Sequence, residues 1–189
     1  MSLPAKLVGV AAVGGGAVAG YLGLVTGALP LDVGVGRRTR PLGPQMVGIQ
    51  APREVVFDVI AQPYLGRATR AMREKVRVLE RGIDMVLAAH STPVAGGRLT
   101  AVTVETVRLT RPSRVDFRLV RGPVPYVMES FVLAEHETGT RLAYEGELGT
   151  DLWALGQRWG QLVARRWEET VAASLTSVKK EAERRSALQ

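Results

Sequence analysis

The sequence contains no cysteine among its 189 residues and only two histidines, His90 and His136. Without thiols the fold uses no disulfide, and neither thiol catalysis nor a thiolate metal site is available. The histidines lie 46 positions apart, which does not match the usual spacing of zinc ligands. No glycine-rich phosphate loop, nucleophile elbow or metal-binding helix motif occurs either. We therefore expect no metal and no cofactor, and any catalytic residues remain unknown at this stage.

Aromatic residues make up only 5% of the chain, and no block of like charge accounts for the formal net charge of +7. Up to residue 40 the charged residues sum to +3, which leaves +4 for the rest; they are Lys6, Asp32, Arg37, Arg38 and Arg40. Elsewhere basic residues alternate with acidic ones, as is typical of a solvated surface rather than a phosphate track. We expect no nucleic-acid partner. Hydrophobic residues, at 46%, suffice for one globular core.

The first charge-free stretch is long, running for 25 residues from Leu7 to Leu31. At about 1.5 Å per residue a helix of this length would cross a hydrocarbon core of roughly 30 Å. We interpret residues 1–31 as a single-pass membrane anchor. Two alternatives stay open: a cleaved signal peptide, with Ala17-Val18-Ala19 resembling a cleavage site, or a glycine-rich extension of a soluble protein.

The flanks of this stretch suggest its orientation. Arg37, Arg38 and Arg40, in a basic linker at 32–43, outweigh Lys6, so the C-terminal domain is expected on the cytoplasmic side. The alternatives are an exported or a soluble cytoplasmic protein. Glycines spaced four apart, as in Gly16/Gly20 and Gly23/Gly27, would let two such helices approach closely, which predicts a possible homodimer.

From about residue 44 to 184 the spacing of apolar residues predicts one α+β domain, followed by a tail at 185–189. A strand at 45–50 leads into a helix that begins near Pro52 and ends before Pro63, and a second short helix is predicted at 64–71. Six strands follow, predicted at 74–79, 83–90, 99–109, 114–120, 126–135 and 140–148. Apolar residues at helical spacing then predict a helix from Leu152 to about Arg185. Only this helix is long enough to fill the concave side of a curved antiparallel sheet of about seven strands.

This order of elements resembles the helix-grip fold of the START-like (SRPBCC) superfamily, which includes polyketide cyclase/dehydrase-type and birch-pollen-allergen (Bet v 1-like) proteins. The residues that carry the resemblance are Ile49-Gln-Ala-Pro52 with the helix to Ile60, Pro112, Phe131-Val-Leu133, Gly139-Thr-Arg-Leu142 and the closing tryptophan-bearing helix. The resemblance implies that a hydrophobic or amphipathic small molecule binds between the sheet and the long helix.

Ten residues are predicted to line that space. They are Phe117, Leu119, Phe131, Leu133, Leu142, Tyr144, Trp159, Leu162, Val163 and Arg166. The Tyr144 hydroxyl, if it points inward, needs a hydrogen-bond partner. Arg166, near the edge of the apolar side of the helix, could anchor a ligand carboxylate, although an outward orientation of its side chain is the more common arrangement. His90 and His136 are interpreted as exposed residues at the ends of strands. Glu105 and Asp116 could face each other across adjacent strands, although ion pairing with Arg108 or Arg118 on the outer face explains them as well.

Three functions follow from this reading. The first is a membrane-tethered binding or transfer protein for a lipid, a quinone or a polyketide-like compound. The second is a cyclase/dehydrase-type enzyme that uses Tyr144, Arg166 or a histidine in the same cavity. The third is an adaptor whose cavity is filled by its own side chains. An ionisable group that faces the cavity with a strongly shifted pKa would separate the enzyme from the others.

Overall fold

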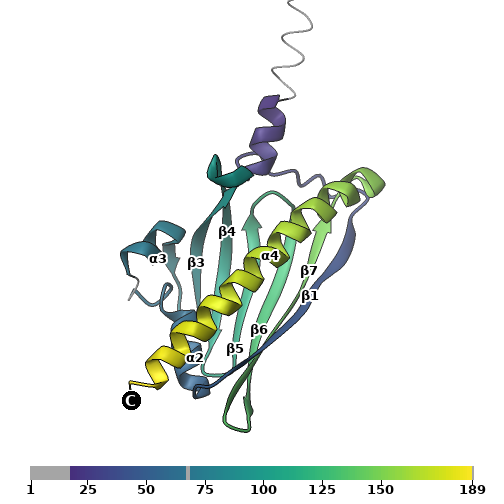
Figure 1. Cartoon of the computed structure of the whole chain (residues 1–189). Helices are drawn as coiled ribbons and strands as arrows, with labels where there is room; N and C mark the ends of the chain where they lie inside the picture. Colours follow the sequence, from purple (N-terminus) through teal and green to yellow (C-terminus); the bar gives the residue numbers. More distant parts are fainter. Residues whose placement is uncertain (1–17, 67–68, 189) are drawn as a thin grey trace, which may run out of the picture.

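Seven antiparallel strands form one curved sheet with the order β1-β7-β6-β5-β4-β3-β2, and a long helix, α4, crosses its concave face (Figure 1). The computed structural model describes residues 18–66 and 69–188. The strands are β1 (Arg38–Ile49), β2 (Val76–Arg81), β3 (Met85–Val94), β4 (Leu99–Thr110), β5 (Arg114–Arg121), β6 (Tyr126–His136) and β7 (Gly139–Thr150). The helices are α2 (Arg53–Ala61), α3 (Arg70–Lys75), the short 3-10 turn η1 (Ala95–Gly97) and α4 (Trp153–Ser186). The predicted α+β architecture is confirmed.

Small residues allow the first turns of α4 to lie directly on the end of β7. A Cβ atom at Gly156 would lie 1.6 Å from the carbonyl oxygen of Asp151, and one at Gly160 would lie 3.0 Å from Thr150 Cγ2. Farther along the helix, Ala164, Val171 and Leu175 are buried on the same side. The helix packs chiefly on β1, β7 and α2, and its backbone comes close to β2 through β6 at few points.

The strand alternation predicted for the inner face is present where the helix and the sheet meet. Val115, Phe117 and Leu119 of β5 are buried, as are Leu142 and Tyr144 of β7. Since side chains alternate between the two faces of a strand, the residues between them point outward, and these are mostly charged.

Several element boundaries differ from the prediction, most clearly those of the first strand and the second short helix. The first strand begins at Arg38 rather than near residue 44, because Arg38 to Leu42 pair with Thr150 to Gly146 of β7 before the register shifts at Gln45. Its prolines are tolerated because β1 is an edge strand. The second short helix starts at Arg70, later than predicted, and residues 62–66 form turns instead.

The N-terminal segment is helical at 18–25 and then turns, so the helix does not continue to Leu31 as predicted. Gly27, with a φ of +72°, terminates it in a conformation that favours glycine. The chain then joins the domain: the Val102 amide donates to Thr26 O at 2.9 Å, and Arg121 Nε donates to Gly27 O at 3.3 Å.

The structure describes only part of the predicted membrane anchor. Residues 1–17, which include most of the proposed anchor, Gly16 and the start of the possible cleavage site, lie outside the described residues. Over 18–66 and 69–188, every helix is too short or too polar to cross a membrane.

Candidate site on the concave face

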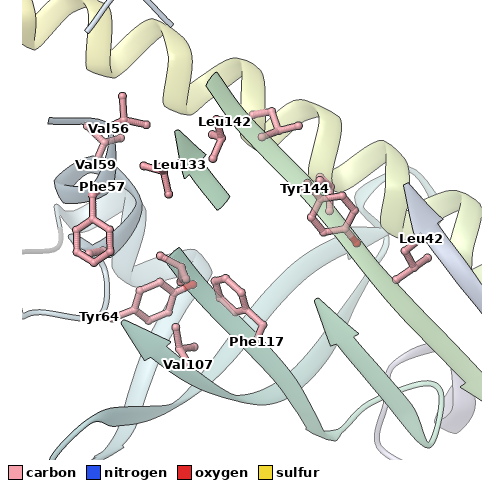
Figure 2. Close-up of a cluster of buried hydrophobic side chains, with 14 of the residues drawn as sticks. Leu42, Val56, Phe57, Val59, Tyr64, Val107, Phe117, Leu133, Leu142 and Tyr144 are labelled. Atoms are coloured by element: carbon pink, nitrogen blue, oxygen red, sulfur yellow. The ribbon is translucent and has the colours of Figure 1, made fainter. Parts of the chain in front are cut away.

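Five rings form a continuous aromatic series across the inner face of the sheet. The centroid distances are 5.2 Å from Tyr144 to Phe131, 5.6 Å from Phe131 to Phe117 and 5.9 Å from Phe117 to Tyr64. His90 lies 5.8 Å from Tyr64 and 6.2 Å from Phe117 at the end of the series. Figure 2 shows Tyr144, Phe117 and Tyr64 on the side of the sheet that faces α4. Phe117, Phe131 and Tyr144 lie on the inward-facing sides of β5, β6 and β7. His90 comes from β3, and Tyr64 from the turn that follows α2.

A buried carboxylate, Glu129 of β6, lies beside this series. Its Oε2 accepts hydrogen bonds from Tyr144 Oη at 2.8 Å and from the Trp167 indole Nε1 at 2.7 Å. Opposite Glu129 on β7 is Gly146, where a Cβ atom would lie 2.9 Å from Glu129 Cβ and 2.7 Å from Met128 O. The glycine therefore gives the close approach that this pair of strands needs at Glu129, and is explained without a ligand.

The surroundings of Glu129 disfavour its charged form. Burial, followed by the nearby charge of Glu105, raises the pKa of Glu129 to about 7 from an ordinary value of 4.5, against the opposing effect of its two hydrogen bonds. Burial and the charge of Glu129 in turn raise the pKa of the Tyr144 hydroxyl, so that it stays a donor. Of the hydrogen-bonded pair Glu129 and Tyr144, it is thus the Glu129 carboxyl that titrates near neutral pH.

A second polar group occupies β3 and β4. Glu105 is buried, accepts a hydrogen bond from Thr103 Oγ1 at 2.6 Å, and places its Oε2 3.1 Å from His90 Nδ1. That His90 contact is close enough for an ion pair but is not aligned as a hydrogen bond. On its other side His90 Nε2 lies 2.9 Å from Tyr64 Oη, within hydrogen-bond distance.

The pKa values of this group follow from the same charges. Burial lowers the pKa of His90, but the charge and contact of Glu105 outweigh it, and the net shift is upward. Burial and the charge of Glu105 raise the pKa of Tyr64 well above its ordinary value. Tyr64, His90 and Glu105 therefore form a buried polar cluster, in which His90 lies between the Tyr64 hydroxyl and the Glu105 carboxylate. The single strand β5 separates the strand of Glu105 from that of Glu129.

Comparison with solved structures identifies the architecture. The Zhui aromatase/cyclase from Streptomyces sp. R1128 aligns with a TM-score of 0.64 and 19% identity over 78% of this chain and 96% of its own. Norcoclaurine synthase from Thalictrum flavum, in complex with dopamine and hydroxybenzaldehyde, aligns with a TM-score of 0.57 and 12% identity over 77% and 87%. The chain has the helix-grip fold.

One further helix-grip structure is larger than this chain. The di-domain aromatase/cyclase BexL from the BE-7585A biosynthetic pathway aligns with a TM-score of 0.56 and 18% identity, over 80% of this chain but only 50% of its own length. The chain thus spans about half of that protein. No protein-family model matches the sequence, and a search of curated proteins finds no match.

Eight of the ten predicted lining residues lie on the inner side of the helix-grip domain. Phe117, Leu119, Leu133, Leu142 and Tyr144 are buried, and Phe131, Trp159 and Val163 are partly buried against the core.

Leu162 and Arg166 do not lie inside, and their predicted inward placement is wrong. Leu162 is 50% exposed, and Arg166 is exposed and pairs with Glu169 at 2.8 Å. Leu162 is two residues from both Gly160 and Ala164, and Arg166 is two residues from Ala164. Two residues are about 200° of helix rotation, and Gly160 and Ala164 are buried against the sheet.

Three polar residues of the site, His90, Glu105 and Glu129, have surroundings that the sequence analysis did not predict. His90 is not at an exposed strand end, because β3 continues to Val94 and His90 lies within it. Glu105 and Asp116 do not face each other: Glu105 is opposite Leu119, whereas Asp116 is opposite Arg108 and bonds Arg114 and Ser130. One sequence signal could have revealed Glu129: it lies two residues before Phe131 on the same strand. Since side chains alternate along a strand, Glu129 faces inward if Phe131 does.

Two hollows of the described molecule lie away from this face. One, of about 460 Å³, is at the surface beside the start of α2, lined by Ala51, Arg53, Glu135 and neighbours, and one of about 60 Å³ lies between β1 and the first turns of α4. Over residues 18–66 and 69–188 no group of three or more His, Asp or Glu side chains is arranged to hold a metal ion.

Proposed function

We propose that this helix-grip protein binds an apolar or amphipathic small molecule between α4 and the inner face of β3 to β6. The observation that carries the proposal is the placement of two buried carboxylates, Glu105 and Glu129, among aromatic side chains. An apolar lining with a few convergent polar groups and shifted pKa values is the common composition of a small-molecule site.

Packing alone does not account for these carboxylates. Burying a carboxyl group costs free energy unless its partners compensate, and apolar residues of similar size would stabilise a purely structural core at least as well. A ligand with a hydroxyl or carbonyl group could exchange hydrogen bonds with Tyr64, His90 or Glu129, while its apolar body lay against Phe117 and Phe131.

The ligand class follows from this lining and from the helix-grip relatives. Aromatic rings offer flat surfaces to another ring, and the similar structures include aromatase/cyclases and a synthase bound to two aromatic compounds. We therefore favour a polyketide-like or quinone-like aromatic compound over an acyl-chain lipid. It would enter over β3 to β5, away from β1 and β7, on which α4 packs.

The same proposal places the domain at a membrane. The uncharged run that begins at Leu7 and continues into the helix at 18–25 supports a tether, and an apolar ligand that partitions into the bilayer would then have a short path to the site. Protease protection of a C-terminal tag in sealed vesicles tests the cytoplasmic orientation. A tag protected on the opposite side of the membrane would contradict it.

Native mass spectrometry of the full chain, extracted in mild detergent and incubated with a membrane lipid extract, tests binding. We expect a co-purifying mass in the range of a small organic molecule, and its loss when Leu119→Glu places a further charge on the inner face. Leu162→Glu, on the exposed side of α4, is the matched control and should retain the adduct. A wild-type chain that always emerges empty would reject the proposal.

An enzyme is the second candidate, because burial raises the pKa of Glu129 to about 7. A carboxylate with such a pKa is a suitable general base near neutral pH. In the step we propose, Glu129 takes a proton from the carbon next to a ligand carbonyl: the C–H bond breaks, an O–H bond forms on Glu129, and the electron pair moves to the carbonyl oxygen. Tyr64 or His90 would donate a hydrogen bond to that oxygen.

2-Tetralone, an aromatic ketone with acidic C–H groups, is a direct probe of this step. The wild-type chain should accelerate the exchange of its α-protons for deuterium in D₂O, followed by NMR, and Glu129→Gln should reduce the acceleration at least tenfold, on the order expected for a general base. Glu145→Gln, on the outer face of β7, serves as the control. Equal exchange with and without protein would exclude this activity for the probe.

A further inference from the structure

We infer that one end of the domain contacts an anionic lipid bilayer directly, beyond the tether itself. We call this end the N-terminal face and define it by six exposed apolar residues: Tyr21, Leu29, Val33, Val35, Trp153 and Leu155. The inference rests on the proposed membrane location but not on the identity or the existence of a ligand. In Figure 1 the helix at 18–25 and the start of α4 lie at the same end of the molecule, away from the C terminus.

Contacts between distant parts of the sequence assemble this face. The Leu29 amide donates to Gly23 O at 2.9 Å, and the Tyr21 ring packs edge-on against Trp159 at 6.4 Å. The Leu152 amide donates to Val35 O at 2.9 Å, and the Trp153 amide to Gly36 O at 3.0 Å. The segment that leads from the N-terminal helix to β1 is therefore fixed beside the start of α4.

A buried carboxylate holds this segment in place. Asp151 Oδ2 accepts the amides of Val33 and Gly34, each at 2.8 Å, and its Oδ1 accepts Arg37 Nε at 2.8 Å. The Asp151 side chain is fully buried, whereas Val33 and Val35 beside it stay exposed. Their exposure is thus imposed by an ordered structure.

All six apolar side chains of this face are about half exposed or more. The exposed fractions are 55% for Tyr21, 49% for Val33, 51% for Leu29 and Val35, 53% for Trp153 and 68% for Leu155. Apolar residues that gather on one face mark a contact with another apolar phase, and tryptophan and tyrosine prefer the boundary between lipid and water.

The charges at this end fit an anionic lipid surface. Arg38, Arg98, Arg121 and Arg158 are exposed on the elements that form or border the face. Its two acidic residues, Asp32 and Asp151, both pair with Arg37, at 2.6 Å and 2.8 Å, so this group of three keeps a charge of −1 against the four exposed arginines. Exposed arginines around an apolar patch attract anionic headgroups.

The course of the chain favours lipid over a protein partner. The uncharged run that starts at Leu7 leads straight into the helix at 18–25, which ends on this face. The chain therefore leaves the described part of the molecule at this face, next to the helix at 18–25. With a bilayer there, the exposed apolar side chains would enter its interface and the arginines would reach its headgroups.

The absence of cysteine makes the inference easy to test, because a single introduced cysteine is the only site for a thiol-reactive label. The environment-sensitive fluorophore NBD would be attached to the full chain at Val35→Cys or Leu155→Cys, with Ile83→Cys as the control. Ile83 is fully exposed and precedes β3, whereas the N-terminal face is near the opposite end of that strand. Each protein would be reconstituted with vesicles of phosphatidylcholine and phosphatidylglycerol.

We expect a blue shift and increased emission at positions 35 and 155 but not at 83, with a weaker response in phosphatidylcholine alone. Protein that floats with the vesicles while positions 35 and 155 stay silent would overturn this inference and leave the tether standing. Protein that does not float would reject both membrane claims, while the ligand test in detergent would be unaffected. A response that appears without lipid as protein concentration rises would show self-association of this face and overturn lipid contact.

Discussion

Glu129 is the residue whose chemistry changes most with conditions. It accepts two hydrogen bonds, from Tyr144 and Trp167, while burial raises its pKa to about 7. The two effects oppose each other, because the hydrogen bonds stabilise the carboxylate and the apolar surroundings destabilise it. The group therefore lies between its neutral and charged forms near physiological pH, where it can accept a proton or hydrogen-bond to a neutral ligand.

The pH dependence of stability should show this shift. Because the folded pKa, about 7, lies above the ordinary 4.5, the native state binds the proton more tightly than the unfolded state. This contribution to stability is complete below about pH 4.5 and is lost as pH rises toward 7, a change on the order of 3 kcal/mol. Urea unfolding of wild type and Glu129→Gln across this range measures it. The difference between their unfolding free energies should vary with pH, and parallel curves would contradict the assigned shift.

The hydroxyl of Tyr144 should matter more than that of an ordinary tyrosine. Tyr144→Phe removes a donor to a buried carboxyl group and should lower the free energy of unfolding by about 1 to 3 kcal/mol at neutral pH. Tyr126→Phe is the matched control, since the Tyr126 hydroxyl donates to the partly exposed Glu147 at 3.1 Å. If the two variants lost equal amounts of unfolding free energy, the hydrogen bond from Tyr144 to Glu129 would contribute no more to stability than that of an ordinary tyrosine.

At the scale of elements, the junction between β7 and α4 organises one end of the molecule. Gly156 and Gly160 allow the helix to begin against the sheet, and Asp151 ties the preceding segment to the same point. Arg37 and the amides of Gly34 and Val33 lower the pKa of the Asp151 carboxyl, so it stays charged at neutral pH. One side chain thus links residues that are more than a hundred positions apart in the sequence.

Asp151→Asn should loosen this junction. Losing the charge-assisted bonds is expected to cost about 1.5 to 3 kcal/mol and to speed hydrogen exchange at the Val33 and Gly34 amides. Hydrogen exchange followed by mass spectrometry measures the effect on peptides that cover 26–37. Asp32→Asn is the control, because this exposed partner of Arg37 should contribute under about 1 kcal/mol. Unchanged exchange in Asp151→Asn would mean that the segment is held by other contacts.

For the whole molecule, periodicity predicted the order of strands, the long helix and the inward side of β5 and β7. It did not reveal the polar site, because Glu129, His90 and Glu105 become neighbours only through the register of β3 to β6. A single strand pattern treats a glutamate as an outward residue. Leu162 and Arg166 were misplaced for a related reason: the small residues Gly160 and Ala164, not the large apolar ones, fix which side of α4 meets the sheet.

The Trp167 indole proton tests the central claim, ligand binding at the concave face, most directly, since it is bonded to Glu129 inside the site. NMR of the three tryptophan indoles in the full chain, assigned with Trp→Phe variants, would be recorded during titration with 2-naphthol, an aromatic hydroxyl compound. We predict a saturable shift of the Trp167 signal. The signal of Trp153, which is exposed at the start of α4, should stay in place. A Trp167 signal that does not move, or a shift confined to Trp153, would contradict binding at this face.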